Sequence, residues 1–182
     1  MQRLFISINC NDEIKKQLLS VQEQMKSKSE RGNFSRHENF HLTLAFLGET
    51  PTELIEPICS CLNEIQKPPV TPFSLTFSRT GFIKRGGKEL WWIEADQNNS
   101  SLTILNNLRY RITSGLSARK ISFDNKAFKP HITLGREIIH DLPIIIPKQE
   151  IVFPVNRVSL MKSEHINKVL VYTEVYGAEL NG

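Results

Sequence analysis

Apolar residues alternate with polar ones in some parts of the chain and recur at helical spacing in others. The alternation from Leu4 to Ile8 predicts a strand, because successive side chains of a strand point to opposite faces. Apolar residues three or four positions apart predict a helix from Ile14 to Met25, which Asn11 or Asp12 is placed to cap. The same rules predict helices at residues 52–66 and 101–116, and strands at residues 40–47, 70–83, 90–95, 150–161 and 169–176.

Polar, glycine-containing and proline-containing segments separate these elements. Residues 27–36 predict a loop, residues 48–51 a turn, and residues 138–148 an irregular connection. Thr50 or Thr52 is placed to cap the second helix. The third helix is expected to start at Ser100 or Ser101. The diglycine segment 84–88 predicts the tip of a hairpin.

Strands and helices that mix with hairpins favour an α+β fold over a doubly wound parallel sheet. A chain of 182 residues fits one domain built of two lobes that share a core. The two halves have a similar order of elements, which suggests a weak internal duplication. We therefore expect antiparallel sheets flanked by helices and related by a pseudo-two-fold axis, with a central cleft.

The tripeptide His-x-Thr occurs twice, 90 residues apart, as His-Leu-Thr-Leu from residue 41 and His-Ile-Thr-Leu from residue 131. Each copy has the alternation of a strand, with the aliphatic residues on the opposite face. His41 and Thr43 would then share one face, as would His131 and Thr133. Two such strands side by side would present two imidazoles and two hydroxyls to the cleft.

These four side chains suit acid–base chemistry on a phosphodiester. Imidazole titrates near neutral pH, so one ring can act as a base while the other acts as an acid. Threonine hydroxyls donate hydrogen bonds that stabilise charge on phosphate oxygens. Neither motif has an obvious serine or cysteine nucleophile beside it, which favours water as the nucleophile.

Other uses of histidine must be weighed against this interpretation. A single histidine on a strand is more often structural than catalytic, and we interpret His37, His140 and His165 as surface or loop residues. Paired histidines also bind metals, but hydrolytic metal sites usually add carboxylates or an HExxH helix. Neither motif has such a partner, so no metal or other cofactor is expected.

The two motifs in full closely resemble the paired HxTx signatures of the two-histidine phosphoesterase superfamily. They read His-Leu-Thr-Leu-Ala-Phe-Leu-Gly-Glu from residue 41 and Lys-Pro-His-Ile-Thr-Leu-Gly-Arg from residue 129. Within that superfamily, the chain looks most like RNA 2′,3′-cyclic phosphodiesterases, also called 2′-5′ RNA ligases. The resemblance extends over nearly the whole chain.

The resemblance implies metal-independent hydrolysis of a terminal 2′,3′-cyclic phosphate to a 2′-phosphomonoester. It assigns His41 as the proton donor and His131 as the proton acceptor, with Thr43 and Thr133 on phosphate oxygens. The near-symmetric motifs do not by themselves make the assignment of acid and base. Reversal of the reaction would ligate RNA through a 2′-5′ bond, which we do not expect to be the main role.

Further residues are candidates for substrate binding. Arg136 matches the arginine of the family's second motif, and its guanidinium suits phosphate oxygens. Its offset of five residues from His131 would turn it away from the cleft unless the strand bends. Phe46 and Phe128 are candidates to stack on a base, with core packing as the alternative. Lys84 and Arg85 at the hairpin tip are candidates to steer RNA, with a solvated tip as the alternative.

Composition limits the partners and the compartment. The net charge of +4 is modest, and Lys and Arg are spread along the chain, unlike a protein that coats polynucleotides. The three cysteines show no zinc spacing and suggest free thiols in a reducing compartment. No segment predicts a signal peptide or a membrane span. We expect a cytoplasmic monomer that acts on RNA ends or cyclic nucleotides.

The residues are compatible with two alternatives to an RNA 2′,3′-cyclic phosphodiesterase. The same motifs occur in two-histidine relatives that cleave 2′,5′-oligoadenylates or cyclic ADP-ribose phosphates. The second alternative is a protein that binds RNA ends without catalysis. Both histidines and both threonines are intact, which argues against it.

Overall fold

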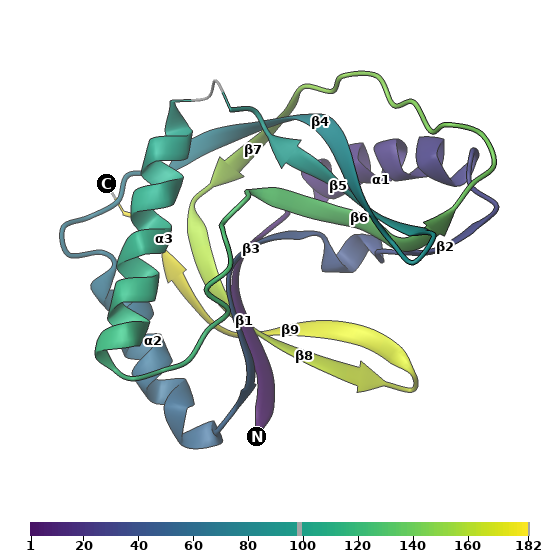
Figure 1. The fold of residues 1–182 in the computed structure, drawn as a ribbon. Coiled ribbons are helices and arrows are strands. Elements are labelled where there is room, and N and C mark those ends of the chain that lie inside the picture. The colour runs from purple at the N-terminus through teal and green to yellow at the C-terminus, as the bar shows by residue number, and fades with distance from the viewer. Residues whose placement is uncertain (98–99, 182) are drawn as a thin grey trace.

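A computed structural model describes residues 1–97 and 100–181 of the chain. Within these residues, nine strands form a single sheet in which all pairs are antiparallel (Figure 1). The strands are β1 (Gln2–Asn9), β2 (Arg31–Phe34), β3 (His41–Thr50), β4 (Phe73–Arg85), β5 (Lys88–Ala95), β6 (His131–Ile139), β7 (Ile151–Val155), β8 (Arg157–Ile166) and β9 (Val169–Glu179). Their order in the sheet is β7-β4-β5-β6-β3-β1-β8-β9, and β2 pairs with β6.

The two strands that carry the His-x-Thr motifs lie side by side at the centre of this order. Leu42 of β3 pairs with Ile132 of β6. On either side of this pair the sheet continues in matching sequence, with β5, β4 and β7 on one arm and β1, β8 and β9 on the other. The expected pseudo-two-fold arrangement is therefore present in the order of the strands, and the two expected sheets are the two arms of one continuous sheet.

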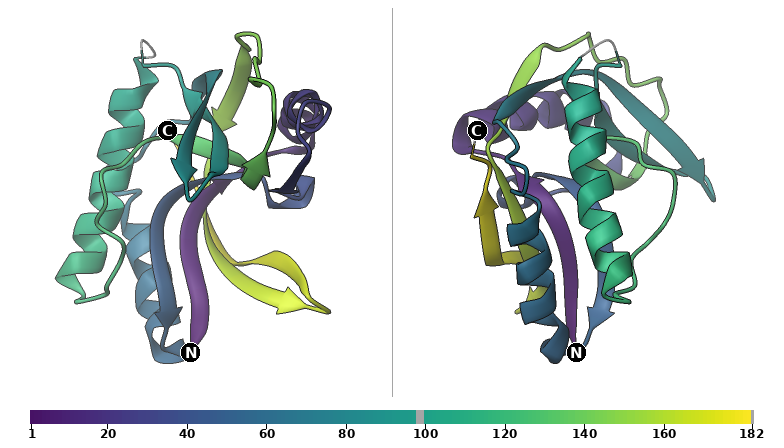
Figure 2. Two further views of the ribbon diagram at one scale, coloured as in Figure 1. Left: turned by 45° about the vertical axis from the view of Figure 1, so that its right-hand side comes forward. Right: turned by 90° about the vertical axis from the view of Figure 1, so that its left-hand side faces the viewer.

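Three helices pack on the sheet. Helix α1 (Asp12–Lys26) contacts β2, β6 and β7, while α2 (Ile55–Glu64) contacts β8 and β9, and α3 (Ser101–Ala118) contacts β3 and β4. Figures 1 and 2 show α2 and α3 side by side on one flank of the molecule and α1 on the other. The apolar sides of the motif strands belong to the core, since Leu42, Leu44, Ile132 and Leu134 are at most 2% exposed.

The α+β prediction is confirmed, and the predicted cap of the first helix is present. The Asn11 side chain accepts a hydrogen bond from the backbone nitrogen of Ile14 at 2.9 Å. The predicted cap of the second helix is wrong, because Leu54 stands at its start and makes no side-chain cap, whereas the third helix begins at Ser101 as predicted. A short 3₁₀ turn, η2 (Thr52–Leu54), leads into α2 instead.

Three other expectations about local structure are wrong. The predicted loop at residues 27–36 contains strand β2, which has no hydrophobic alternation because it is a short strand with a half-exposed surface. The predicted turn at residues 48–51 lies largely within β3, where Gly48 takes a φ of +70°. The predicted strand at residues 150–161 is two strands, since β7 and β8 are separated at Asn156 and join opposite arms of the sheet.

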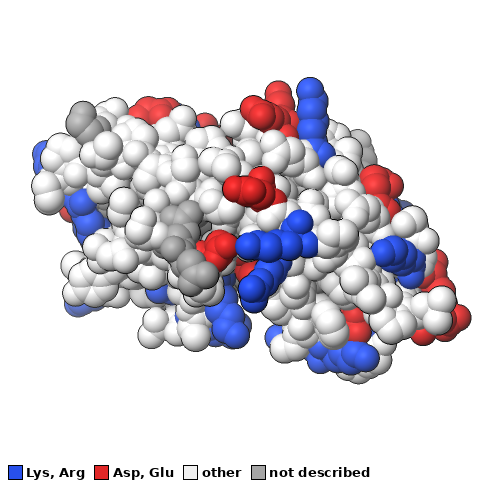
Figure 3. Space-filling view, turned by 90° about the horizontal axis from the view of Figure 1, so that it is seen from above, with Lys and Arg blue, Asp and Glu red and all other residues white. Residues whose placement is uncertain are grey.

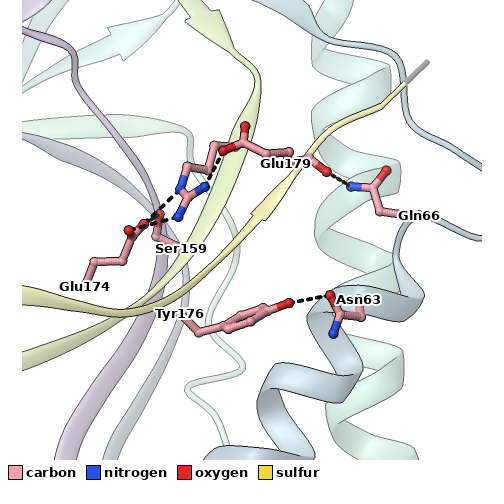
Figure 4. Close-up of polar contacts among 7 residues, drawn as sticks. Asn63, Gln66, Ser159, Glu174, Tyr176 and Glu179 are labelled. Carbon is pink, nitrogen blue, oxygen red and sulfur yellow. Dashed lines mark hydrogen bonds and ion pairs between the residues drawn. The ribbon is translucent and has the colours of Figure 1, made fainter.

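The β8–β9 hairpin projects away from the rest of the sheet and is held at its base by polar contacts (Figure 4). Arg157 binds both carboxylate oxygens of Glu174, at 3.0 Å each, and also pairs with Glu179. Its guanidinium lies close to Gly177, and a Cβ there would be 2.0 Å from Nη2, so a larger residue would displace Arg157 from its carboxylate partners. The Tyr176 hydroxyl donates to Asn63 of α2, as Figure 4 shows.

Candidate active site

A cleft of about 800 Å³ lies on the face of the central strands opposite the helices. Its residues come from the motif strands, from the segment that includes β2 and η1 (His37–Asn39), and from the β8–β9 hairpin. In Figure 1 this hairpin extends below strands β2 and β6, so the lining residues come from well-separated parts of the sheet. The size is in the upper part of the usual range for small-molecule sites, about 300–1,000 Å³.

All four residues of the two His-x-Thr tripeptides line this cleft. Because Leu42 pairs with Ile132 in an antiparallel register, His41 lies across from Thr133 and Thr43 across from His131 when the register is continued by one residue. Directly opposite side chains on one face of an antiparallel pair are about 5 Å apart at Cβ. The structure thus brings two imidazoles and two hydroxyls together from segments 90 residues apart.

His41 is held in one tautomer by the backbone. Its Nδ1 lies 2.7 Å from the carbonyl oxygen of Asn39, and since a carbonyl only accepts, Nδ1 carries the proton. In the neutral ring, Nε2 then accepts a hydrogen bond from the Thr43 hydroxyl at 2.9 Å. Burial lowers the pKa of His41 to about 4, against the opposing effect of the Asn39 hydrogen bond.

His131 has the same tether and more open surroundings. Its Nδ1 lies 2.6 Å from the carbonyl oxygen of Lys129, again two residues upstream, which fixes the proton on Nδ1. No hydrogen bond from a described residue reaches its Nε2, which is therefore available to a bound molecule. Its nearest aromatic neighbour is Trp92, whose ring centre lies 5.8 Å away.

A β-bulge in each motif strand brings a further residue to the cleft. Ile6 pairs with Ala45 and Ser7 with Thr43, so one step along β1 matches two along β3, and Leu44 is the extra residue. A bulge of this kind shifts the alternation of the side chains that follow it. Phe46, five residues after His41, consequently faces the cleft.

The second motif repeats this bulge at the same position. Trp91 pairs with Gly135 and Trp92 with Thr133, which leaves Leu134 as the extra residue of β6. Arg136, five residues after His131, therefore lines the cleft. From the sequence, the spacing of five residues between His131 and Arg136 suggests that Arg136 points away from the cleft. The bulge reverses this, and the alternation of the four motif residues does not reveal the bulge.

Side chains from two helices bind the carbonyl groups at these bulges. Gln22 of α1 is 1% exposed and donates from Nε2 to the carbonyl oxygens of Leu134, at 2.7 Å, and Ser35, at 2.8 Å. Arg109 of α3 donates from Nε to the carbonyl oxygen of Leu44 at 3.1 Å. The Leu134 carbonyl oxygen also accepts a hydrogen bond from the backbone nitrogen of Ser35 at 2.9 Å. The helices thus fix the two bulges from the side opposite the cleft.

Three of the other candidate residues lie elsewhere. Phe128 is half-buried beneath the Arg109 guanidinium, 4.7 Å from its ring centre, and does not line the cleft. Lys84 pairs at 3.4 Å with Glu89, a carboxylate that is 4% exposed. Arg85 is exposed at the hairpin tip, outside the residues that line the cleft.

Two of the remaining histidines are surface or loop residues, as interpreted, and have contacts that the sequence did not indicate. His165 is exposed but lines the cleft from β8. His140 does lie in the connection after β6, yet its side chain is 16% exposed and its Nε2 lies 2.8 Å from Glu89. Trp91 also donates to this carboxylate, at 2.7 Å. Desolvation raises the pKa of Glu89, but its hydrogen-bonding partners outweigh this effect and lower the pKa overall.

Several residues that line the cleft had no signal in the sequence. Arg3 and Phe5 come from β1, Arg36 from the segment before η1, and Tyr172 from β9. Each is a single residue with no repeated pattern, and strand alternation alone does not tell a cleft face from a solvent face. The pairing of β1 with β3 and β8 brings Arg3 and Phe5 to the site.

The charge of the cleft is one-sided. Among the described residues that line it are three arginines and three histidines, and none of them is an aspartate or glutamate. The face seen from above in Figure 3, by contrast, shows basic and acidic side chains interspersed. Positive charge concentrated in the cleft favours an anionic ligand there.

The described part of the chain contains neither a cluster of metal-binding side chains nor a membrane-spanning helix. At residues 1–97 and 100–181, no group of three or more His, Cys, Asp or Glu side chains is arranged to hold a metal ion. None of the helices in that part is both long and apolar enough to span a bilayer. The three cysteines are unpaired, with Cys10 and Cys61 buried and Cys59 half-buried.

Comparison with known proteins agrees with the geometry. The family model described as "LigT like Phosphoesterase" matches residues 8–91, which include the first motif. The RNA 2′,3′-cyclic phosphodiesterase of Thermotoga maritima is 33% identical over 139 residues, which cover 74% of this chain and 69% of that protein. The chain belongs to the LigT-like phosphoesterase family. The family predicted from the paired motifs is thereby confirmed.

Other LigT-like phosphoesterases match along the whole chain. The RNA 2′,3′-cyclic phosphodiesterase of Thermus thermophilus is 28% identical over 99% of this chain and 91% of its own length. The crystal structure of Escherichia coli LigT complexed with 3′-AMP has a TM-score of 0.82 at 25% identity, covering 100% of this chain and 99% of that one. The similarity thus includes both motif strands and the β8–β9 hairpin.

Proposed function

We propose that this protein is an RNA 2′,3′-cyclic phosphodiesterase that hydrolyses a terminal 2′,3′-cyclic phosphate to a 2′-phosphomonoester. The observation that carries the proposal is the pair of imidazoles, each tethered through Nδ1 and each lining one cleft without carboxylates. The names of the relatives from Thermotoga maritima and Thermus thermophilus support this substrate class.

In the proposed reaction, a water oxygen attacks the phosphorus as the bond from phosphorus to O3′ breaks. Nε2 of His131 accepts the proton of the attacking water, and Nε2 of His41 donates a proton to the departing O3′. The hydroxyls of Thr43 and Thr133 donate hydrogen bonds to the non-bridging oxygens. Arg136 adds a guanidinium at the same charge. Both imidazoles exchange protons with solvent before the next turnover.

His41 must gain a proton before it can act as the acid. Burial holds its pKa at about 4 in the free protein, so the ring is neutral near pH 7. An opposite charge within a few ångströms favours the protonated form. Binding of the anionic phosphodiester beside His41 therefore raises its pKa and loads the acid only when substrate is present.

The test uses an oligoribonucleotide with a 2′,3′-cyclic phosphate end, incubated with the protein in excess EDTA. We expect a product that resists a 3′-specific phosphatase, as a 2′-phosphate would. His41→Ala and His131→Ala should each lower the rate by about 10²–10⁴-fold, the usual contribution of a general acid or base. His37→Ala is the control, because His37 is exposed and outside the cleft.

The outcomes separate the readings. Full activity in either cleft variant would exclude the two-histidine mechanism. A folded wild-type protein that is inactive with EDTA and with added Mg²⁺ would be assayed next on 2′,5′-oligoadenylate and on cyclic ADP-ribose phosphate. Binding of the RNA end without any turnover would favour a non-catalytic role. We further propose a cytoplasmic monomer that uses neither a metal nor another cofactor, with RNA ligation only as the reverse reaction.

A further inference from the structure

Tyr172 of β9 lies in the cleft against His41. The two ring centres are 5.3 Å apart with the planes at 86°, an edge-on contact. Phe5 of β1 completes the group, with its ring centre 4.9 Å from both Tyr172 and His41. His41 is thus enclosed by two aromatic rings, whereas Trp92 alone approaches His131, at 5.8 Å. The near-symmetric motifs have unequal surroundings, and Tyr172 is one cause of the difference.

The hydroxyl of Tyr172 has no hydrogen-bond partner in the described part of the protein. Buried tyrosine hydroxyls usually find a partner. No buried side-chain oxygen or nitrogen in that part lacks one, so this hydroxyl must be reachable from the solvent in the cleft. Tyr176, four residues further along the same strand, has its hydroxyl bonded to Asn63 of α2 (Figure 4).

The charge around the Tyr172 hydroxyl favours an anionic partner. Burial raises the pKa of Tyr172, and the guanidinium groups of Arg136 and Arg3 act in the opposite direction. The hydroxyl is therefore protonated near pH 7 and able to donate, in the field of two arginines. Arg136, His41 and Tyr172 all line the same cleft, and the Arg136 guanidinium also lowers the pKa of His41.

We propose that Tyr172 is a further substrate-binding residue, whose hydroxyl donates a hydrogen bond to a phosphate oxygen that Arg136 also contacts. The inference rests on the proposed function for the identity of the substrate. The hydroxyl keeps its proton throughout, so no bond other than this hydrogen bond is made. The ring has a separate role, because with Phe5 it excludes water from His41 and keeps that imidazole neutral until phosphate binds.

The hydroxyl is tested by Tyr172→Phe, with Tyr176→Phe as the matched control on the same strand. A hydrogen bond to a charged group contributes enough that its loss lowers kcat/KM about 10- to 100-fold. We expect that loss for Tyr172→Phe and near wild-type activity for Tyr176→Phe. The affinity for inorganic phosphate, measured by calorimetry, should fall in parallel. Unchanged turnover and phosphate affinity in Tyr172→Phe would overturn the role of the hydroxyl.

The ring is tested by following the His41 imidazole by NMR as a function of pH. Tyr172→Phe should leave the pKa of His41 near 4, because the ring remains. Tyr172→Ala admits water and should raise the pKa of His41 towards its ordinary range. An unchanged pKa in Tyr172→Ala would overturn the role of the ring. This readout separates positioning from stability, since a merely structural change would not alter the titration.

The two proposals fail in different ways. If wild-type protein hydrolyses no cyclic phosphate but Tyr172→Phe still binds inorganic phosphate more weakly than Tyr176→Phe, the proposed reaction fails and the anion contact stands. If wild-type protein is active and both variants match it in turnover and phosphate affinity, the reaction stands and the inference about Tyr172 fails.

Discussion

His41 and His131 have the same tether to the backbone and different environments. In each, Nδ1 donates to a carbonyl oxygen two residues upstream, at 2.7 Å for His41 and 2.6 Å for His131. The rings of Phe5 and Tyr172 lie against His41, and burial lowers its pKa to about 4. Two residues with one sequence context therefore lie in different environments, and a reaction with one acid and one base needs such a difference.

The pKa of His41 should depend on whether an anion is bound in the cleft. By NMR, its pKa in the free protein should be about 4 and should rise when inorganic phosphate is added, because the anion stabilises the imidazolium. Protonation of the buried ring is easier in the unfolded chain, so the free energy of unfolding should fall as the pH is lowered from about 6.5 towards 4.

His37 provides an internal reference for this titration, since it is exposed and does not line the cleft. Its resonances should not respond to phosphate. A His41 signal that titrates in the ordinary range in the free protein would contradict the role given to Phe5 and Tyr172. A low pKa that phosphate leaves unchanged would contradict the loading of the acid by substrate.

At the scale of single residues, the sequence predicts what is repeated and misses what is not. The two His-x-Thr tripeptides stand out because a second copy in the same context is improbable by chance. Tyr172 has no such copy, and it meets His41 only because β9 pairs with β8 and β8 with β1. Residue type and spacing carry no information on that pairing.

Two helices control the shape of the motif strands. The carbonyl groups of Leu44 and Leu134, the extra residues at the two bulges, accept hydrogen bonds from Arg109 of α3 and Gln22 of α1. These contacts come from the core side, whereas the residues that the bulges redirect, Phe46 and Arg136, lie in the cleft. The helices therefore influence which side chains face the cleft, although these contacts lie outside it.

Replacement of Gln22 tests this link. Gln22→Met keeps the length of a buried side chain but removes the donor, which leaves two carbonyl oxygens with one hydrogen bond fewer. The free energy of unfolding should fall by about 1–3 kcal/mol, as measured with urea. Because the bulge at Leu134 is loosened, KM should rise more than kcat falls, as expected for misplacement of Arg136.

Gln24→Met is the matched control in the same helix, since the Gln24 amide only reaches the carbonyl oxygen of Ser20 at 3.4 Å on the exposed side. It should leave both the stability and KM close to wild type. A loss of stability in Gln22→Met with an unchanged KM would mean that the bulge holds its shape without this donor.

At the scale of elements, hydrophobic alternation predicts most strands but misses the short strand β2 and the two bulges. Strand β2 is missed because Gly32 faces Ile138 so closely that a Cβ there would lie 2.3 Å from its Cδ1. Close packing thus replaces the apolar side chain that a pattern search needs. The bulge at Leu134 is missed because one inserted residue in a short strand looks like the end of the alternation.

At the scale of the whole molecule, the cleft is the region of the described structure in which basic side chains gather without acidic ones. Its net charge is only +4, and the three arginines of the cleft, Arg3, Arg36 and Arg136, have no carboxylate beside them among the described residues that line it. Two of them do pair with carboxylates outside that lining set, Arg36 with Glu38 at 3.2 Å and Arg3 with Glu49 at 3.7 Å. Contacts with RNA phosphates should therefore be few and should lie near the chain end. The sequence predicts a small net charge that is spread along the chain. It does not predict that the described lining of the cleft lacks carboxylates, because the tertiary fold determines which residues line the cleft.

The salt dependence of turnover measures how many phosphates the protein contacts. For single strands, the logarithm of the binding constant falls with that of the salt concentration by about 0.7 per phosphate contact. Three cleft arginines then predict a slope of about −2 for kcat/KM on an oligoribonucleotide, and a shallower slope on a mononucleoside 2′,3′-cyclic phosphate. A slope as steep as that of proteins with about 6–10 phosphate contacts would contradict binding confined to the cleft.

Variants at the tip of the β4–β5 hairpin test whether RNA phosphates are also contacted outside the cleft. Lys84 and Arg85 are the sequence-based candidates to steer RNA, yet both lie outside the residues that line the cleft. If they contact RNA phosphates, the Lys84→Ala/Arg85→Ala double variant should make the slope shallower by about 1.4, the value for two contacts. If the slope stays the same and Arg136→Ala makes it shallower by about 0.7, the cleft alone holds the RNA end. We expect the second result, because the Lys84 ammonium is already paired with the buried Glu89.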